Sequence, residues 1–304
     1  MSFMDVKNFM IKSILDLWKR NRDAITGYLF IFPALAIFIG FIAYPFTYEL
    51  WLSFHEKNPG LEAKFIGLRN FLEVISDPTF HRVSINSCVY TFTAVFAKLL
   101  IGLGMALLLN QKFKARGVVR ALVLIPWALP TYVSTLAWRW MYHHTLGLFN
   151  YLLLNFGIIR HPIMWLGDPK MAMASVIMVN IWRGVPFFAL ILLAGLQTIP
   201  TELYEAADVD GANAWQKFRY ITLPYLKYIM LFVTLISTLW TFNDFEIVYL
   251  LTKGGPVNAT HLFATYTYEV GFIVLKLGLA AAIPTLLMPF FLTLMVKVTQ
   301  LMER

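Results

Sequence analysis

Charged side chains stand within stretches of this sequence that are otherwise apolar and long enough to cross a membrane. They are Lys98, Arg183, Asp244, Glu246 and Lys276. Because a charge inside a bilayer is costly, it is normally kept there only where it is paired or has a function. These residues therefore indicate a polar site within the membrane, although Lys98 and Lys276 are expected near an interface or against a partner helix.

Polar and aromatic side chains also recur at helical spacing in three of these stretches. Residues at i, i+3, i+4 and i+7, or at i and i+4, share one face of a helix. The candidate substrate-binding residues selected in this way are Trp127, Thr131, Asn180, Arg183, Gly184, Phe187, Ser237, Thr241 and Asp244. A ring beside hydroxyl, amide and carboxylate groups suits a sugar, whose C–H face stacks while its hydroxyls form hydrogen bonds. Alternatively, these polar groups only join one helix to another.

Two of these residues allow two interpretations. Arg183 and Asp244 can pair with each other across the site, because a buried charge is rarely left unpaired. Alternatively, Arg183 binds an acidic group of a solute, such as a uronate, through a bidentate contact.

The elements that must position these residues are membrane-spanning helices. The chain of 304 residues is 59% hydrophobic, 16% aromatic and only 14% charged, which excludes an ordinary cytosolic globule. Hydropathy predicts six spans, over 25–51, 88–110, 121–141, 171–197, 226–251 and 271–296. Since Cys88 is the single cysteine, neither an intramolecular disulfide nor a cysteine-rich metal site can form.

The distribution of positive charge predicts the topology. If the N-terminus is cytoplasmic, thirteen Lys and Arg residues fall on the inner side and seven on the outer side. Basic loops stay in the cytoplasm, so both termini are expected there, and the net charge of +8 needs no nucleic acid partner. Residues 1–24 form a cytoplasmic tail whose spacing over 3–18 fits an interfacial helix or, equally, a frayed end.

The sequence offers no recognisable catalytic machinery. The nucleotide-binding, nucleophile-elbow and zinc-protease motifs are all missing, and the adjacent His143 and His144 do not converge on one metal. We therefore expect no catalytic residue and no metal site. Any uphill transport requires energy from another subunit.

The stretch over 198–225 has the pattern of two short helices. Thr201 is the expected N-cap of the first, Glu202 and Glu205 lie in or near its first turn, and Gly211 suits a left-handed C-terminal cap. A second amphipathic helix is expected to end at Pro224. Two helices joined in this way would form a compact docking element exposed to the cytoplasm.

Here the sequence resembles the permease subunits of binding-protein-dependent ABC importers, of the carbohydrate class. The EAA motif of that family is matched by Glu205-Ala206-Ala207, Gly211 and Ile221-Thr222-Leu223-Pro224. Further matches extend over nearly the whole chain, at Phe32-Pro33-Ala34, Tyr44-Pro45, Ser53-Phe54, Ile125-Pro126, Leu251-Thr252 and Gly254-Gly255-Pro256. Within that class the chain resembles the larger maltose permease subunit without its additional N-terminal spans and large periplasmic domain.

The resemblance implies an all-α integral membrane protein with the type I (MetI-like) importer fold, in one permease domain over 25–304. It implies a coupling helix that docks on an ATPase dimer, with the coupling residues Glu205, Ala206, Ala207, Asp208 and Gly211. It also implies a bacterial inner membrane location, a related second permease subunit and a periplasmic sugar-binding protein. ATP and Mg would be bound by the ATPase, so this chain would be no enzyme.

The family pattern also bears on the candidate site. Substrate contacts of the maltose subunit fall on matching positions here, except that Arg183 is included from its helical face alone. Arg183 and Asp244 stand where that subunit has uncharged residues. Three alternatives remain: a helix resting on lipid at 201–211, a secondary transporter without an ATPase, and an integral membrane enzyme.

Overall fold

The computed structural model describes residues 22–302, and these residues are mainly helical. The amphipathic spacing predicted over 3–18 lies outside them. A short antiparallel hairpin pairs β1 (His55–Glu56) with β2 (Lys64–Phe65). The α-helices are α2 (Arg22–Phe38), α3 (Tyr44–Ser53), α4 (Arg69–Ser76), α5 (Pro78–Asn110), α6 (Arg116–Ala128), α7 (Thr131–Met141), α8 (Leu148–Asn155), α9 (Pro169–Leu196), α10 (Thr201–Val209), α11 (Ala214–Lys217), α12 (Leu223–Phe242), α13 (Glu246–Leu251), α14 (Phe263–Tyr268) and α15 (Leu277–Met302).

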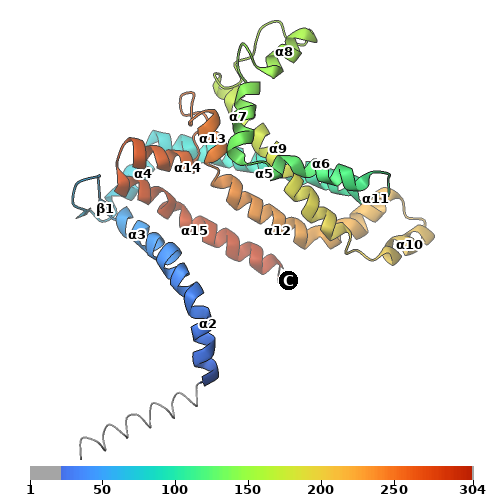
Figure 1. Cartoon of the computed structure of the whole chain (residues 1–304), viewed down its shortest axis with the longest axis horizontal. Helices are drawn as coiled ribbons and strands as arrows, with labels where there is room; N and C mark the ends of the chain where they lie inside the picture. Colours follow the sequence, from blue (N-terminus) through green and yellow to red (C-terminus); the bar gives the residue numbers. More distant parts are fainter. Residues whose placement is uncertain (1–21, 303–304) are drawn as a thin grey trace, which may run out of the picture.

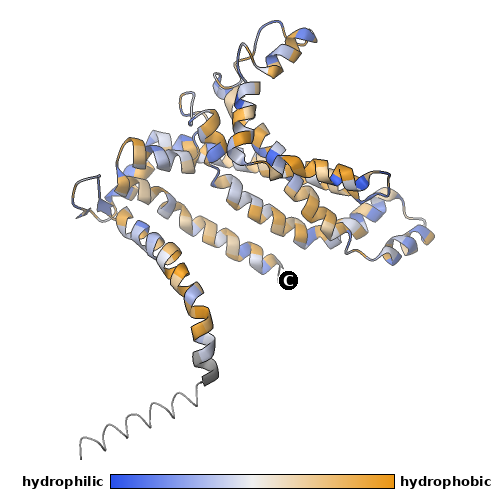
Figure 2. Ribbon diagram, in the orientation of Figure 1, coloured by the Kyte–Doolittle hydropathy of each residue, from blue (hydrophilic) through white to orange (hydrophobic). Residues whose placement is uncertain are grey.

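The long helices form a bundle. Figure 1 shows α5, α6, α9, α12 and α15 side by side, with α10 and α11 at one end and α4 and the hairpin at the other. Helices α7 and α8 project from the bundle, and α2 extends away from it. Apolar residues run along α2 and α15, whereas α10 carries many hydrophilic ones (Figure 2). This distribution fits a bundle that crosses a membrane with polar ends.

Two of the long helices begin at aspartate caps. The Asp77 carboxylate accepts a hydrogen bond from the Thr79 backbone N–H at 2.7 Å. The Asp168 carboxylate accepts from the backbone N–H groups of Lys170 at 3.0 Å and Met171 at 2.9 Å. In both cases a proline follows the cap, where its fixed φ suits the first helical turn. The caps define where α5 and α9 start.

Helices α5 and α9 pack closely because a glycine allows it. A Cβ added at Gly102 would lie 2.4 Å from the Phe188 Cβ, so only hydrogen fits there. Phe188 is fully buried. Tight contact between these two helices fixes the side of α9 that faces the remainder of the bundle.

Six spans are accounted for, but the third is broken. Within residues 22–302, five helices are long and apolar enough to cross a membrane: Thr26–Ser53, Pro78–Asn110, Pro169–Leu196, Ala214–Phe242 and Leu277–Leu301. The predicted span over 121–141 is instead the pair α6 and α7, which meet at 89°. Leu129 and Pro130 are both extended at the break, since proline disfavours a helical residue before it and donates no backbone N–H.

Other predicted boundaries also need correction. The predicted span over 88–110 begins earlier, at Pro78, and the predicted span over 226–251 ends at Phe242 before the separate helix α13. The predicted span over 271–296 begins only at Leu277, because a π-helical turn over Glu269–Ile273 precedes it and Leu275 has a φ of 65°. Hydropathy depends on apolar composition alone, so it did not detect these breaks in the backbone helices.

Candidate functional site

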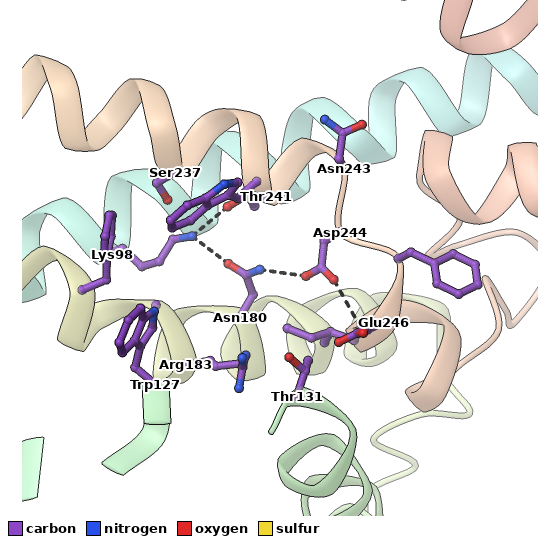
Figure 3. A pocket seen from close by; sticks show the side chains of 15 residues that line it. Lys98, Trp127, Thr131, Asn180, Arg183, Ser237, Thr241, Asn243, Asp244 and Glu246 are labelled. Atoms are coloured by element: carbon purple, nitrogen blue, oxygen red, sulfur yellow. Dashed lines mark hydrogen bonds between the residues drawn. The ribbon is translucent and has the colours of Figure 1, made fainter. Parts of the chain in front are cut away.

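A cavity of about 350 Å³ lies among α5, α6, α7, α9, α12 and α13 (Figure 3). Its lining includes every candidate substrate-binding residue predicted from the sequence. The complete lining is Lys98, Trp127, Thr131, Asn180, Arg183, Gly184, Phe187, Ser237, Trp240, Thr241, Asn243, Asp244, Phe245, Glu246 and Ile247. Its volume is in the usual range for small-molecule sites.

A buried hydrogen-bonded chain crosses one wall of the cavity. The Lys98 ammonium donates to Asn180 Oδ1 at 2.9 Å and to Thr241 Oγ1 at 2.8 Å. Asn180 Nδ2 donates to Asp244 Oδ2 at 2.8 Å. A cation on α5 is thereby joined through an amide on α9 to a carboxylate just after α12 (Figure 3). This linkage compensates the buried Lys98 charge and the half-buried Asp244 charge without direct contact between them.

Asp244 owes its place in this chain to the end of α12. The helix stops at Phe242, and Asp244 lies in the short segment before α13. Its Oδ2 also accepts from the Tyr90 hydroxyl at 2.6 Å, and its Oδ1 accepts from the Ile247 backbone N–H at 3.2 Å. Because several groups donate hydrogen bonds to it, this carboxylate is fixed in position and acts only as an acceptor.

Arg183 does not form the pair with Asp244 that the sequence suggested as one alternative. Its Nη1 donates to the Leu129 carbonyl at 2.8 Å, at the break between α6 and α7. Among the described residues, no Arg183 ion pair is found within 4.0 Å. The carboxylate of Asp244 instead has the partners given above, because Asn180 and Tyr90 reach it from inside the bundle.

Aromatic rings from three helices form another wall. The rings of Trp127 and Phe187 are stacked, with their centroids 6.4 Å apart. The centroid of the Phe187 ring lies 5.1 Å from that of Trp240. Trp127 is 48% exposed and Trp240 58% exposed, so both rings keep free surface. Rings of this kind can stack on the C–H face of a sugar beside the polar chain.

The structure adds residues that sequence patterns missed. Lys98 was expected near an interface or a partner helix, but it lines the cavity and is only 3% exposed. Lys276 lies elsewhere: its ammonium pairs with Glu73 of α4 at 2.9 Å, just before α15. Other additions to the lining are Trp240, Asn243, Phe245 and Ile247, and Glu246, which the sequence indicated only as a charge within a span, also lines the cavity. Helical spacing could have pointed to Trp240, which lies three residues after Ser237.

The predicted coupling residues lie on and directly after α10. Glu205, Ala206 and Asp208 are exposed, and Ala207 is half-buried. Gly211 has a φ of 75°, and the backbone N–H of Ala212 donates to the Ala207 carbonyl at 2.8 Å. This is the left-handed glycine cap predicted from the sequence.

Two details of this segment differ from the sequence prediction. Thr201 is the first residue of α10 and not its cap: Pro200 occupies the cap position, with no side-chain hydrogen bond there. Pro224 does not end the second helix, because α11 continues through a π-helical turn over Phe218–Thr222 into α12. Proline is tolerated there since it stands in the first turn of α12.

Specific contacts connect α10 to the base of α12. The Tyr204 and Thr222 hydroxyls lie 2.9 Å apart, and the Lys217 ammonium pairs with Asp208 at 2.6 Å. Leu203 and Ile221 pack against the same apolar core. Because α12 carries Thr241 at its far end, a displacement of α10 can reach the cavity through one continuous helix.

A bundle of membrane-spanning helices with a polar, aromatic-lined cavity and a helix at one end defines a membrane permease. The chain belongs to the family described as the binding-protein-dependent transport system inner membrane component, whose model matches residues 98–301. ATP is hydrolysed by a separate subunit in such a system, so this chain is the transport component and not an enzyme. The family assignment excludes the secondary transporter and the membrane enzyme considered above.

Named relatives and a solved structure agree with this assignment. The trehalose/maltose transport system permease protein MalF of Thermococcus litoralis is 41% identical over 256 residues, covering 83% of this chain and 86% of that protein. The sulfoquinovosyl glycerol transport system permease protein SmoG of Agrobacterium fabrum is 37% identical over 270 residues, covering 88% and 87% respectively.

The fold matches that of a bacterial ABC transporter involved in the import of the acidic polysaccharide alginate. The TM-score is 0.82 at 23% sequence identity, covering 95% of this chain and 99% of that one. The predicted all-α importer permease fold is therefore confirmed.

Proposed function

We propose that this chain translocates a sugar or sugar derivative delivered by a periplasmic binding protein. The observation that carries the proposal is the cavity, in which all nine predicted residues meet and an aromatic wall faces a hydrogen-bonding wall. Relatives named for trehalose, maltose and sulfoquinovosyl glycerol support a carbohydrate substrate.

The subunit arrangement is part of the same proposal. Helix α10 would be the coupling helix that contacts an ATPase dimer, which binds ATP and Mg. A related second permease subunit would complete the translocation route. The N- and C-termini would then lie in the cytoplasm, on the same side of the inner membrane as α10. ATP acts by binding one conformation more tightly than the other, since only differential affinity shifts such an equilibrium.

The charge of the sugar is a finer proposal. Arg183 lines the cavity and donates only to a neutral carbonyl, so its remaining N–H groups can bind an acidic substituent. Asp244 and Glu246 also line the cavity, so their two formal negative charges equal the two positive charges of Lys98 and Arg183. Arg183 is accordingly proposed to orient one carboxylate of the substrate through a local contact.

The test is sugar uptake by the complex in liposomes. The chain is purified with its copurifying permease and ATPase subunits, and maltose, trehalose and an alginate oligosaccharide are offered on the periplasmic binding protein. We expect ATP-dependent accumulation of at least one sugar and none with the sugar-free binding protein. Accumulation without nucleotide hydrolysis would contradict the proposal.

A further inference from the structure

Lys98 occupies a position in the cavity that the predicted substrate contacts do not explain. The residue is 3% exposed, and its stem crosses the backbone of α9 at Gly184. A Cβ added at Gly184 would lie 2.3 Å from Lys98 Cδ, so the absence of a side chain there makes room for the lysine. The two helices thus provide a fitted place for this cation.

The hydrogen bonds of Lys98 fix how Asn180 is oriented. An ammonium group only donates, so the atom of Asn180 that it meets at 2.9 Å must be the amide oxygen. The amide nitrogen then faces the Asp244 carboxylate at 2.8 Å, which only accepts when ionised. The two charged neighbours therefore exclude the flipped amide.

The same reasoning applies to Thr241. Its hydroxyl oxygen accepts from Lys98 at 2.8 Å, so its own proton remains free for another acceptor. Asn180 likewise retains a second N–H. Both residues line the cavity, where Asn180 is 8% exposed and Thr241 2% exposed.

We propose that Lys98 is a positioning residue that holds Asn180 and Thr241 with their remaining donors toward the cavity, and so favours substrates with acceptor oxygens. The class of ligand is a saccharide presenting hydroxyl, ring or carboxylate oxygens at that wall. This inference rests on the proposed sugar transport. It adds Lys98, which would determine that Asn180 and Thr241 present donors to the cavity. Lys98 itself would not need to contact the sugar.

A second role for Lys98 has to be separated from this one. The ammonium also balances the half-buried Asp244 charge, and removing one member of such a linkage destabilises the fold. The double variant Lys98→Met with Asp244→Asn is balanced in charge and leaves Asn180 and Thr241 without their donor, but it also removes Asp244, a candidate substrate contact. It is therefore compared with Asp244→Asn alone, in which that contact is lost and Lys98 is kept. The comparison distinguishes positioning from charge compensation.

The experiment measures sugar molecules imported per ATP hydrolysed in reconstituted complexes, using maltose, trehalose and an alginate oligosaccharide as probes. We expect both variants to insert, and the double variant to import about tenfold less sugar per ATP hydrolysed than Asp244→Asn alone. Gly184→Ala should show the same defect, because the added methyl displaces the lysine stem while keeping its charge. Gly104→Ala on α5 is the control, since nothing lies within 4 Å of its added Cβ.

The outcomes separate the inference from the proposed function. An equal ratio of sugar to ATP in the double variant and in Asp244→Asn would overturn the positioning role alone. A parallel loss of ATP hydrolysis and insertion in the double variant would also overturn it, by assigning Lys98 to folding. Failure of the wild-type complex to import any probe sugar would overturn both the inference and the proposed function.

Discussion

Arg183 is the residue proposed to give the transporter a preference for an acidic substrate. Replacing it by Met keeps an apolar stem but removes the guanidinium and its bond to the Leu129 carbonyl. We expect uptake of an alginate oligosaccharide to fall about tenfold or more, because a charge-assisted hydrogen bond is lost. Maltose uptake should change far less. The ratio of the two uptake rates in the reconstituted complex is the measurement.

Arg183→Lys provides the matched variant for this prediction. Lysine keeps the charge but not the planar fork, so uptake of the acidic oligosaccharide should recover only in part. Equal losses for both sugars in Arg183→Met would assign the residue to packing at the break between α6 and α7.

Side-chain spacing predicted residues that line one cavity, because the cavity is built from helical faces. The polar face of α9 was complete in the sequence at Asn180, Arg183, Gly184 and Phe187, and the structure places all of it on the cavity. Lys98 could not be assigned in this way. Periodicity shows which residues share a face, but the neighbour of that face depends on how α5 packs against α9.

At the scale of helices, the glycine cap of α10 makes a separate prediction. Gly211→Val places a β-branched residue at a φ of 75°, where the strain is about 1–2 kcal/mol. The cap bonds should fray and sugar uptake should be abolished while the protein remains inserted. Glu205→Lys should also abolish uptake, because it reverses a charge on the exposed surface of α10.

Gly60→Val is the control for backbone strain. Gly60 has a similar φ of 79° but lies in the turn between β1 and β2, remote from α10. Normal uptake is expected in that variant. Uptake measured alongside the amount of protein in the membrane separates lost coupling from lost folding. Wild-type uptake in Gly211→Val would argue against α10 as the coupling helix.

The membrane-spanning helices could be predicted from hydropathy, but the residues at which several of them end could not. The predicted span over 226–251 joined α12 and α13, since apolar residues continue on both sides of the break. Asp244 lies in that break, where three donors satisfy its carboxylate. Hydropathy averages over a window and does not register such a local interruption. The sequence therefore assigned Asp244 to the interior of a helix, although it correctly placed it in the site.

At the scale of the whole molecule, the orientation in the membrane can be tested with single cysteines. Cys88 is replaced by Ser, and a cysteine is introduced at Val209, the last residue of α10, which is 88% exposed. We expect a membrane-impermeant maleimide to label Val209→Cys in inverted vesicles and not in intact cells, because basic segments remain in the cytoplasm.

The matched position is Leu61, which is 61% exposed between the two short strands at the opposite end of the bundle. Leu61→Cys should be labelled in intact cells. Labelling of Val209→Cys from outside would reverse the proposed orientation and remove α10 from contact with a cytoplasmic ATPase.

Helix α2 has a consequence for how the protein is made. The described side chains of α2, which begin at Thr26, are almost all exposed, although most are apolar. An 18-residue apolar window of the Thr26–Ser53 span has none of its residues buried by the described part of the chain. Synthesised in excess over its partner subunits, the chain would present an unassembled hydrophobic helix to the proteases that survey membrane proteins. Its cellular half-life should therefore follow the supply of those subunits, so that balanced synthesis sets how many transporters accumulate.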